Sequence, residues 1–307
     1  MVAATAMWGG HYVLGEVAVK TMSPMDLTYL RWAIAVLPLV LIAQFVEKPD
    51  WRAVLRAWPR LLLLAILGMI AYNLFLYAAL TFTTAIGASL VNAANPAVMA
   101  VLAVFLCRER LRGRAMVGIA VSLLGVLVVL THGSLDALIT LDFNEGQLLM
   151  IGAIVVWSLY SIWGRMPSVP PISSTAAQAV IVLIVMTPFA LVNGVEIPQN
   201  PEPIMALLYI GLFPSVGSYV LWNIAGRTTA PGTAGIFLNL ITVFTVAISV
   251  AFGQALTATD VVGGAVVVIG VLLTSTPSGS IGRLRARSSG REKMRPESQE
   301  LEDVRSS

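Results

Sequence analysis

Apolar stretches long enough to cross a membrane recur along most of the chain, separated by short segments that hold proline, glycine and charged residues. A helix of about 20 residues rises about 30 Å, the thickness of the hydrocarbon core of a bilayer. We place these stretches at residues 2–20, 26–46, 59–80, 84–107, 114–132, 146–165, 173–193, 203–225, 231–253 and 258–276. Of the 307 residues, 57% are hydrophobic and only 11% are charged, whereas soluble domains carry about 25% charged residues. The sequence therefore predicts an all-α integral membrane protein with ten transmembrane helices.

Charged residues between these stretches alternate in sign from one side of the predicted membrane to the other. With the N-terminus in the cytoplasm, the cytoplasmic segments hold most of the basic residues, namely Lys48, Arg52, Arg56, Arg60, Arg108, Arg110, Arg112, Arg114, Arg165 and Arg227. The opposite segments are acidic and contain Asp136, Asp142, Glu145, Glu196, Glu202 and Asp260. This asymmetry predicts that both termini are cytoplasmic. The net charge of +3 follows the same membrane pattern, which argues against a nucleic-acid partner.

An internal repeat divides the predicted helices into two groups of five. At an offset of 145 residues the chain matches itself at Thr84 and Thr229, Ala85 and Ala230, Gly87 and Gly232, Leu111 and Leu256, Gly118 and Gly263, and Gly125 and Gly270. Near the N-terminus the offset becomes 149, which pairs Trp8 with Trp157 and Gly15 with Gly164. Because five is odd, the second copy enters the membrane upside down. Chance matching of glycines in apolar helices is the alternative explanation.

These features predict a three-part organisation. Residues 1–134 form the first five-helix repeat, residues 135–276 form the second and inverted repeat, and the two enclose a central cavity. Residues 277–307 are rich in serine, arginine and glutamate, and we expect them to form a disordered cytoplasmic tail. Inverted repeats are a recurring plan of secondary transporters, in which the two halves rock about a central site.

Short motifs in both halves resemble a known family. The first predicted helix begins with Trp8-Gly9, the second contains Leu30-Arg31, and the fourth contains Pro96 and ends on Glu109-Arg110-Leu111. The segment GIAVSLLGVLVVL returns in the second half as GGAVVVIGVLLTS. Over about residues 1–276 the chain resembles the drug/metabolite transporter superfamily, EamA type, and most of all its YddG-type bacterial amino-acid exporters.

The resemblance implies ten helices in two inverted halves and export of amino acids, aromatic ones included, across the bacterial inner membrane. The second half departs from the family pattern at two positions. Ile241-Thr242 takes the place of a Glu-Pro pair, and Gln254 stands where the first half has Glu109. These departures weaken the transfer of individual residue roles to the ninth predicted helix.

Aromatic and polar residues occupy matching faces of the first and sixth predicted helices. These faces carry Trp8, His11, Tyr12 and Gly15 in the first helix, and Trp157, Tyr160, Ser161 and Gly164 in the sixth. Polar groups inside a bilayer usually face a cavity or a neighbouring helix. We therefore expect both faces to line one substrate-binding cavity, in which the rings stack against the substrate. An aromatic belt at the membrane interface is the alternative, chiefly for Trp8.

Four other predicted helices add polar groups at similar depth. We expect Asn73, Tyr77, Trp222, Asn92, Asn95 and Asn239 to bind substrate. Pro96 cannot donate a hydrogen bond to the carbonyl of Asn92, so a kinked helix would offer that carbonyl and the amides to an amino group. Hydrogen bonding between helices explains the same residues equally well. We also expect hinges or kinks at Pro38, Pro96, Pro188 and Pro214.

Three of the charged residues in the predicted helices bear on transport. Glu16 is the only carboxylate deep within one, where it can carry a coupling proton. Lys20 lies one turn later, and an ion pair between the two is the favoured interpretation. Arg31 lies just inside the second helix, where it either attracts a substrate carboxylate or extends to the membrane interface. Because carboxylates deep within the predicted helices are scarce, the sequence is compatible with facilitated diffusion as well as with proton antiport.

Small residues form stripes on the fifth and tenth predicted helices, at Gly118, Ser122 and Gly125 and at Gly263 and Gly270. Such stripes let helices approach closely, either between the two halves or in a dimer. We accordingly expect a monomer or a homodimer.

The chain lacks the short motifs of several enzyme classes. It has no HExxH, no GxSxG and no P-loop, and only two histidines and one cysteine. We expect no catalytic residue, cofactor or metal site. The sequence favours a secondary transporter of amino acids or similar metabolites in the lipid bilayer. The alternatives are export of drugs or other metabolites and, less favoured, an intramembrane enzyme.

Overall fold

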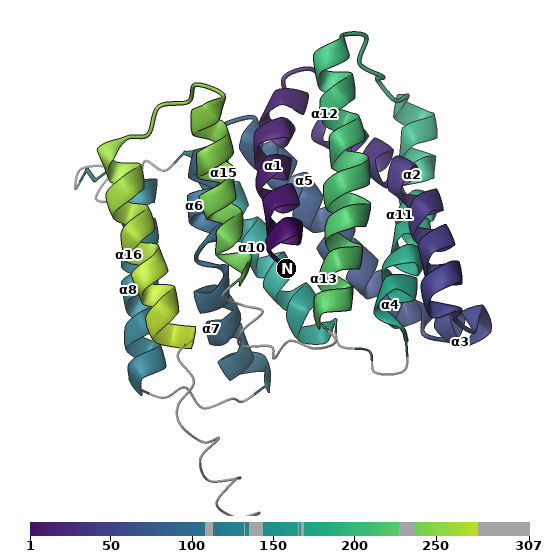
Figure 1. The fold of residues 1–307 in the computed structure, drawn as a ribbon, viewed down its shortest axis with the longest axis horizontal. Helices are drawn as coiled ribbons and strands as arrows, with labels where there is room; N and C mark the ends of the chain where they lie inside the picture. Colours follow the sequence, from purple (N-terminus) through teal and green to yellow (C-terminus); the bar gives the residue numbers. More distant parts are fainter. Residues whose placement is uncertain are drawn as a thin grey trace, which may run out of the picture. The chain divides into compact units, whose positions relative to one another are not determined.

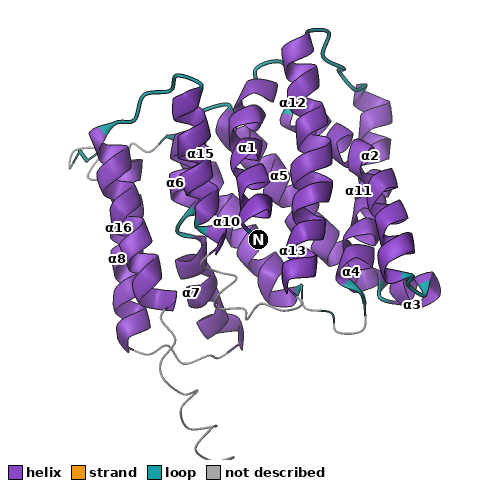
Figure 2. Ribbon diagram, viewed as in Figure 1, coloured by secondary structure: helices purple, strands orange, loops and turns teal. Residues whose placement is uncertain are grey.

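The computed structural model describes residues 1–107, 113–131, 133–134, 144–164, 166, 169–226 and 237–275, and within these ranges every regular element is a helix (Figure 2). In the first half these are α1 (Val2–Ala18), α2 (Pro24–Ile42), η1 (Ala43–Glu47), α3 (Trp51–Arg56), α4 (Trp58–Leu64), η2 (Ala65–Ala71), α5 (Tyr72–Leu80), α6 (Ala85–Asn92), α7 (Asn95–Cys107) and α8 (Gly113–Leu130). In the second half they are α10 (Glu145–Trp163), α11 (Pro171–Asn193), α12 (Pro201–Leu212), η3 (Phe213–Ser218), α13 (Tyr219–Gly226), α15 (Leu240–Ala251) and α16 (Ala258–Ser275). The segments named η are π-helical.

Six helical segments are long and apolar enough to cross a membrane, among the residues that the structure describes. They are Pro24–Glu47, Trp58–Leu80, Ala85–Leu106, Glu145–Trp163, Pro171–Asn193 and Pro201–Trp222, and their ends lie within three residues of the predicted spans. The other four predicted spans overlap α1, which has 17 residues, and the shorter apolar helices Met116–Leu130, Leu240–Ala251 and Ala258–Gly270. The chain is therefore a multi-pass membrane protein.

The outer surface of the bundle is apolar, as contact with lipid requires. Phe105 and Leu191 expose 76% and 80% of their surface, and large aliphatic side chains are exposed on most of the long helices. In a soluble protein such extensive apolar exposure would drive association. In a bilayer it is the surface that the lipid tails cover.

Helix starts follow ordinary capping chemistry. The hydroxyl of Ser23 accepts the N–H of Asp26 at 3.0 Å, and Pro24 occupies the first turn of α2. Thr84 caps α6 by accepting the N–H of Gly87 at 3.1 Å. The side chain of Asn144 accepts the N–H of Gly146 at 2.8 Å and so begins α10. These caps satisfy amide groups that have no partner inside the helix.

Two of the long spans contain a π-helical segment, and a third span is broken into two helices. The segments η2 and η3 lie within the spans Trp58–Leu80 and Pro201–Trp222. The span Ala85–Leu106 is interrupted at Ala93 and Ala94, so that α6 and α7 are separate helices. A similar turn at Asn239 precedes α15. Such interruptions in helices are frequent at functional sites.

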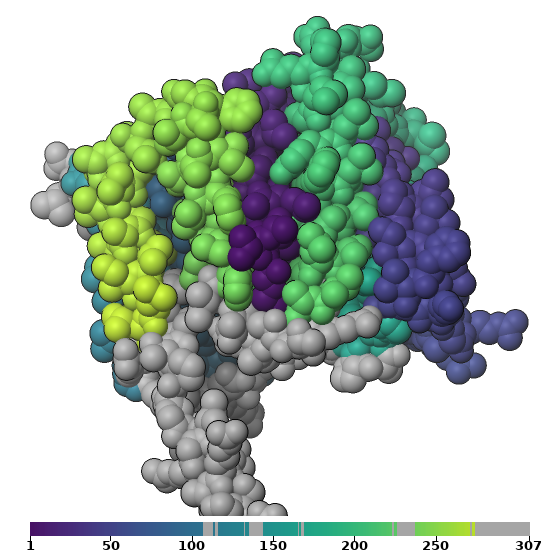
Figure 3. All heavy atoms as spheres, viewed as in Figure 1, coloured from purple at the N-terminus to yellow at the C-terminus, as the bar shows by residue number. Residues whose placement is uncertain are grey.

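Helix α1 runs through the middle of the bundle, between α15 and α12 (Figures 1 and 3). The most extensive helix pair in the structure is α8 with α16. A Cβ atom on Gly125 would lie 2.6 Å from the backbone nitrogen of Val267, and one on Gly270 would lie 2.6 Å from the carbonyl oxygen of Gly118. The two predicted glycine stripes thus face each other within one chain, where they bring the backbones of α8 and α16 together.

Several sequence predictions lie outside the described residues. They concern the basic segment 108–112, the acidic positions in segment 135–143, the segment 227–236 that precedes α15, and the tail 277–307.

Candidate functional site

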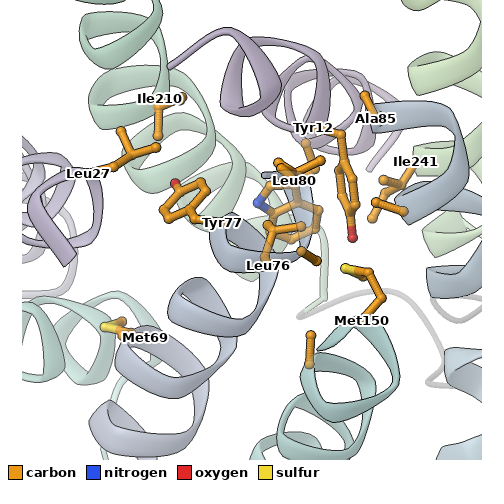
Figure 4. Packing of buried hydrophobic residues seen from close by; sticks show 14 of the residues in the cluster. Tyr12, Leu27, Met69, Leu76, Tyr77, Leu80, Ala85, Met150, Ile210 and Ile241 are labelled. Carbon is orange, nitrogen blue, oxygen red and sulfur yellow. The ribbon is translucent and has the colours of Figure 1, made fainter. Parts of the chain in front are cut away.

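A cavity of about 460 Å³ lies among the helices at the level of these interruptions. Residues of α1, α2, α5, α6, α7, α10, α13 and the start of α15 line it, namely Trp8, His11, Tyr12, Arg31, Tyr72, Asn73, Asn92, Asn95, Pro96, Met99, Ala100, Ala103, Trp157, Ser161, Ile162, Tyr219, Leu238, Asn239 and Ile241. Tyr12, one of these lining residues, also belongs to an apolar cluster that contains Leu76, Leu80 and Met150 (Figure 4). Both halves of the sequence contribute walls.

Eight of the eleven predicted substrate-binding residues lie on the cavity wall: Trp8, His11, Tyr12, Asn73, Asn92, Asn95, Trp157 and Asn239. The other three support residues of the wall. The Tyr77 hydroxyl lies 2.7 Å from Nε2 of His11. Tyr160 packs on Trp157 with ring centroids 5.2 Å apart, and Trp222 packs on Trp8 at 5.5 Å.

Arg31 is the most unusual residue of the wall, because its side chain is charged and only 2% exposed. Its Nε and one terminal nitrogen donate to the hydroxyl of Ser215 at 3.0 and 2.8 Å. The other terminal nitrogen donates to the side-chain oxygen of Asn73 and to the Tyr77 hydroxyl, the latter at 2.7 Å. The guanidinium also lies 5.1 Å from the ring centroid of Trp32, at the distance of a cation–π contact. Arg31 is therefore held inside the bundle and does not extend to the membrane interface.

His11 belongs to the same network. The terminal nitrogen of Arg31 that donates to Asn73 and Tyr77 also lies 2.9 Å from Nε2 of His11. This nitrogen has only two N–H groups, so the three acceptors share them, and His11 accepts in the neutral tautomer that carries its proton on Nδ1. The Tyr77 hydroxyl then donates to His11 and accepts from Arg31. The contacts of Arg31 with Asn73, Tyr77, His11 and Ser215 are all with neutral groups.

The broken helix contributes the amide part of the wall. Asn92 ends α6 and Asn95 begins α7. The side-chain oxygen of Asn95 accepts from the hydroxyl of Ser158 at 3.3 Å. The side-chain oxygen of Asn92 is buried and has no hydrogen-bond partner within the described part of the chain. Asn92 therefore belongs to the cavity wall, although this oxygen is itself shielded from the cavity.

Aromatic rings form the rest of the wall. Trp8 meets Tyr219 edge to face with centroids 5.8 Å apart. Tyr72 and Trp157 lie 4.9 Å apart, and the Tyr72 hydroxyl is 3.1 Å from that of Tyr12. Rings held in this way offer a rigid apolar surface with few polar points.

Glu16 has partners other than the predicted one. Its carboxylate accepts the backbone N–H of Ala85 at 2.7 Å, and Gln254 donates to both of its oxygens, at 3.1 and 2.9 Å. No ion pair joins Glu16 to Lys20 in the structure as described. The carboxylate sits instead at the N-terminus of α6, where the unpaired amides and the helix dipole favour an anion.

The four predicted kink prolines differ in their surroundings. Pro96 directly follows the break between α6 and α7, and Pro214 lies at the start of η3. Pro38 and Pro188 lie inside the helices α2 and α11, which continue through them. Only the first two coincide with an interruption of α-helical geometry.

Sequence reasoning missed several wall residues, including Tyr72, Met99 and Tyr219. Tyr72 directly follows the π-helical segment η2, and Tyr219 directly follows η3. A π-helical turn shifts the faces on which later side chains lie, so spacing rules for an α-helix do not place these tyrosines. The recurrence of a tyrosine after an interrupted span in both halves is a signal that only the structure reveals.

Comparison with known proteins places the chain among transporters. The sequence model of the EamA-like transporter family matches residues 1–131 and again residues 144–276. The uncharacterized transporter YyaM of Bacillus subtilis (strain 168) is 26% identical over 272 residues, covering 87% of this chain and 89% of the relative. A probable amino-acid metabolite efflux pump of Salmonella typhimurium (strain LT2) is 25% identical over 283 residues, covering 87% of this chain and 90% of the relative. A crystal structure shares the fold, with a TM-score of 0.62 at 21% identity over 89% of this chain and 95% of that chain.

Proposed function

The chain belongs to the EamA-like transporter family, and from this premise we propose that it is a secondary transporter that exports amino acids or similar small metabolites by alternating access. The observation that carries the proposal is the cavity of about 460 Å³ among helices with the composition of membrane spans. Proteins hold small organic molecules in pockets of roughly 300–1,000 Å³. The wall combines aromatic rings with amide and guanidinium groups, which suits a substrate with an apolar side chain and a polar end.

In this proposal the chain crosses the membrane ten times, as inverted repeats of residues 1–134 and 135–276. Two pairs of helix interruptions support the repeat. The π-helical segments η2 and η3 lie in the third and eighth predicted spans. The 145-residue offset pairs Ala94, at the break before α7, with Asn239, at the turn before α15. Interrupted helices in matching places of two halves commonly hold the substrate of a transporter between them.

We propose that both termini lie in the cytoplasm and that the membrane is a bacterial inner membrane. Helix α3, with the exposed residues Arg52 and Arg56, lies at one end of the bundle, and the loop between α11 and α12, with Glu196, lies at the other (Figure 1). Basic segments are retained on the cytoplasmic side of a membrane. The end that carries α3 is then the cytoplasmic end.

The cavity wall supports a state that is open toward the cytoplasm. It continues along α7 to Ala103 and along α10 to Ile162, toward the helix ends that the proposal places inside the cell. A second hollow of about 420 Å³ lies at the outer end, where Gln254 and Asp260 belong to its lining. Between these two hollows, the carboxylate of Glu16 in α1 accepts hydrogen bonds from Ala85, the first residue of α6, and from Gln254. Alternating access would open this outer contact and close the inner end.

Amino acids are the proposed substrates because the wall offers a cation beside aromatic rings and amide side chains, and because one relative is named a probable amino-acid metabolite efflux pump. The test is counterflow in liposomes that contain only this protein. Liposomes loaded with unlabelled amino acids should take up labelled ones, and empty liposomes should not. Ala100→Trp, which fills the cavity, should abolish the exchange in a protein that still folds. Absence of exchange for every proteinogenic amino acid would contradict the proposal.

A further inference from the structure

We propose that Arg31 is the binding site for an acid group of the substrate, so that the cavity selects molecules that carry a carboxylate. The inference rests on the proposed transport function and names the chemical group that the cavity requires. Its starting point is the burial of Arg31, whose side chain is 2% exposed and lies on the cavity wall. An arginine side chain keeps its positive charge inside proteins, because its pKa is far above any physiological pH.

The charge of Arg31 has no negative partner in the described part of the molecule. Its hydrogen-bond acceptors are a serine hydroxyl, an asparagine amide, a tyrosine hydroxyl and a histidine ring nitrogen, all of them neutral. The described cavity wall contains no aspartate or glutamate. Glu16 is bonded to Ala85 and Gln254. A buried charge without a counter-ion is unfavourable, so its persistence in a cavity wall indicates that an anion binds there.

The geometry leaves Arg31 able to accept such an anion. A guanidinium has five N–H groups in one plane. Nε and one terminal nitrogen both point to the single oxygen of Ser215, which leaves the second N–H of that terminal nitrogen without an acceptor in the described structure. Ser215 in turn donates to the carbonyl of Ile210 at 2.7 Å, which fixes its position. The guanidinium is therefore held in a fixed orientation before any substrate arrives.

Asn92 suggests what the other end of the substrate is. Asn92 belongs to the same cavity wall as Arg31, but its side-chain oxygen is shielded from the cavity and accepts no hydrogen bond from any described residue. A buried acceptor without a donor is costly, and a substrate ammonium group would supply the donor once the Asn92 side chain turns toward the cavity. A fixed cation and an unused acceptor around an aromatic space together match a zwitterion with an apolar side chain. The carboxylate would meet Arg31, and the ammonium group would meet Asn92.

The test compares competitors on the unmodified protein. Counterflow of labelled L-phenylalanine is measured with four unlabelled competitors: L-phenylalanine, L-phenylalaninamide, phenethylamine and 3-phenylpropanoate. We expect the amide and the amine, which lack the carboxylate, to compete about tenfold or more weakly than L-phenylalanine. We expect 3-phenylpropanoate, which lacks only the ammonium group, to compete more strongly than the amide and the amine. Equal competition by the amine and the amino acid would overturn the inference and leave transport itself intact, whereas absence of exchange for every proteinogenic amino acid would refute the proposed transport as well.

A variant series provides the second arm. Arg31→Gln should lower the exchange of L-phenylalanine. In this variant, unlabelled L-phenylalaninamide and L-phenylalanine should compete about equally well. Arg31→Lys should keep part of the preference for the acid. Arg56→Gln removes an exposed arginine and serves as the matched control. If Arg31→Gln does not fold, the competitor series on the unmodified protein decides alone. A folded Arg31→Gln protein that still prefers the acid would contradict the assignment.

An inorganic anion is the remaining candidate for the partner of Arg31. A bound chloride would make exchange depend on chloride and would leave amine and acid equally good competitors. Repeating the competitor series in methanesulfonate buffer, which contains neither chloride nor a carboxylate, separates the two cases. Unchanged preference for the carboxylate without chloride supports the proposed site, and exchange that stops without chloride speaks against it.

Discussion

Glu16 of α1 accepts a hydrogen bond of 2.7 Å from the backbone N–H of Ala85, the first residue of α6. Gln254, in the loop before α16, donates to the same carboxylate at 2.9 Å. One side chain therefore ties together three segments that are distant in the sequence. Because the contact lies beyond the cavity on the side away from α3, we interpret it as part of the closed outer end.

Removing the charge of Glu16 should loosen this end. In Glu16→Gln an amide still reaches Ala85, but the attraction between a carboxylate and the helix N-terminus is lost, at a cost of about 1 kcal/mol. The outward-open state should then gain roughly fivefold in population. The measurement is the rate at which an impermeant thiol reagent, added outside, modifies Ser89→Cys in a Cys107→Ser background. Lys20→Gln, in the turn directly after α1, should leave that rate unchanged.

The same variant tests proton coupling. If a coupling proton passes through Glu16, the transport rate of the unmodified protein varies between about pH 5 and 8 and the rate of Glu16→Gln does not. We expect both proteins to respond to pH in the same way, because the carboxylate is engaged in a structural contact with Ala85. A pH response that disappears only in Glu16→Gln would establish coupling and contradict the structural role.

Tyr77→Phe should destabilise the protein without disturbing its packing. The ring of Tyr77 is fully buried, and its hydroxyl links Arg31 to His11 with two contacts of 2.7 Å. Losing the hydroxyl leaves buried polar groups with fewer partners, which costs about 1–3 kcal/mol. The unfolding temperature in detergent should fall accordingly. Tyr29→Phe is the control, because its hydroxyl makes one partly buried contact of 3.3 Å with Thr187, and an equal fall in both variants would refute the special role of Tyr77.

Gly125→Ala should separate α8 from α16. The added Cβ would lie 2.6 Å from the backbone nitrogen of Val267 and 2.8 Å from the carbonyl oxygen of Gly263, and neither backbone atom can move independently. Overpacking of this kind costs about 1–3 kcal/mol. Thermal unfolding in detergent is the measurement. Gly113 is the first residue of the same helix, and a Cβ atom added there has no neighbour within 4 Å. Gly113→Ala should therefore unfold at the same temperature as the unmodified protein.

The long helices were predictable because their signal is simple. A run of about 20 apolar residues has few other solutions in a membrane, and the six longest spans end within three residues of their predicted positions. The glycine stripes were also predictable as contacts, although the sequence alone left open whether Gly125 would face another part of the same chain. The structure resolves that choice by placing Gly125 against Gly263.

The site was less predictable because its residues depend on interruptions of the helices. Sequence reasoning, which assumed α-helical spacing, selected Asn73 and Tyr77, and in the structure both contact Arg31. It could not place Tyr72 or Tyr219, which follow π-helical segments. The favoured partner of Glu16 was wrong because local spacing pointed to Lys20, whereas the contact with Ala85 spans 69 residues. Long-range partners of this kind cannot be deduced from spacing within one helix.

Protection of a single cysteine in the cavity tests most directly that this cavity holds the substrate. Ala100→Cys in a Cys107→Ser background places a thiol on the wall, and Ala255→Cys places one in the exposed loop before α16. We predict that a saturating transported amino acid slows modification of the thiol at position 100 about tenfold and leaves that at position 255 unchanged. Equal modification rates at position 100 with and without the amino acid, in a protein that exchanges it, would place the substrate elsewhere and contradict the assignment of the site.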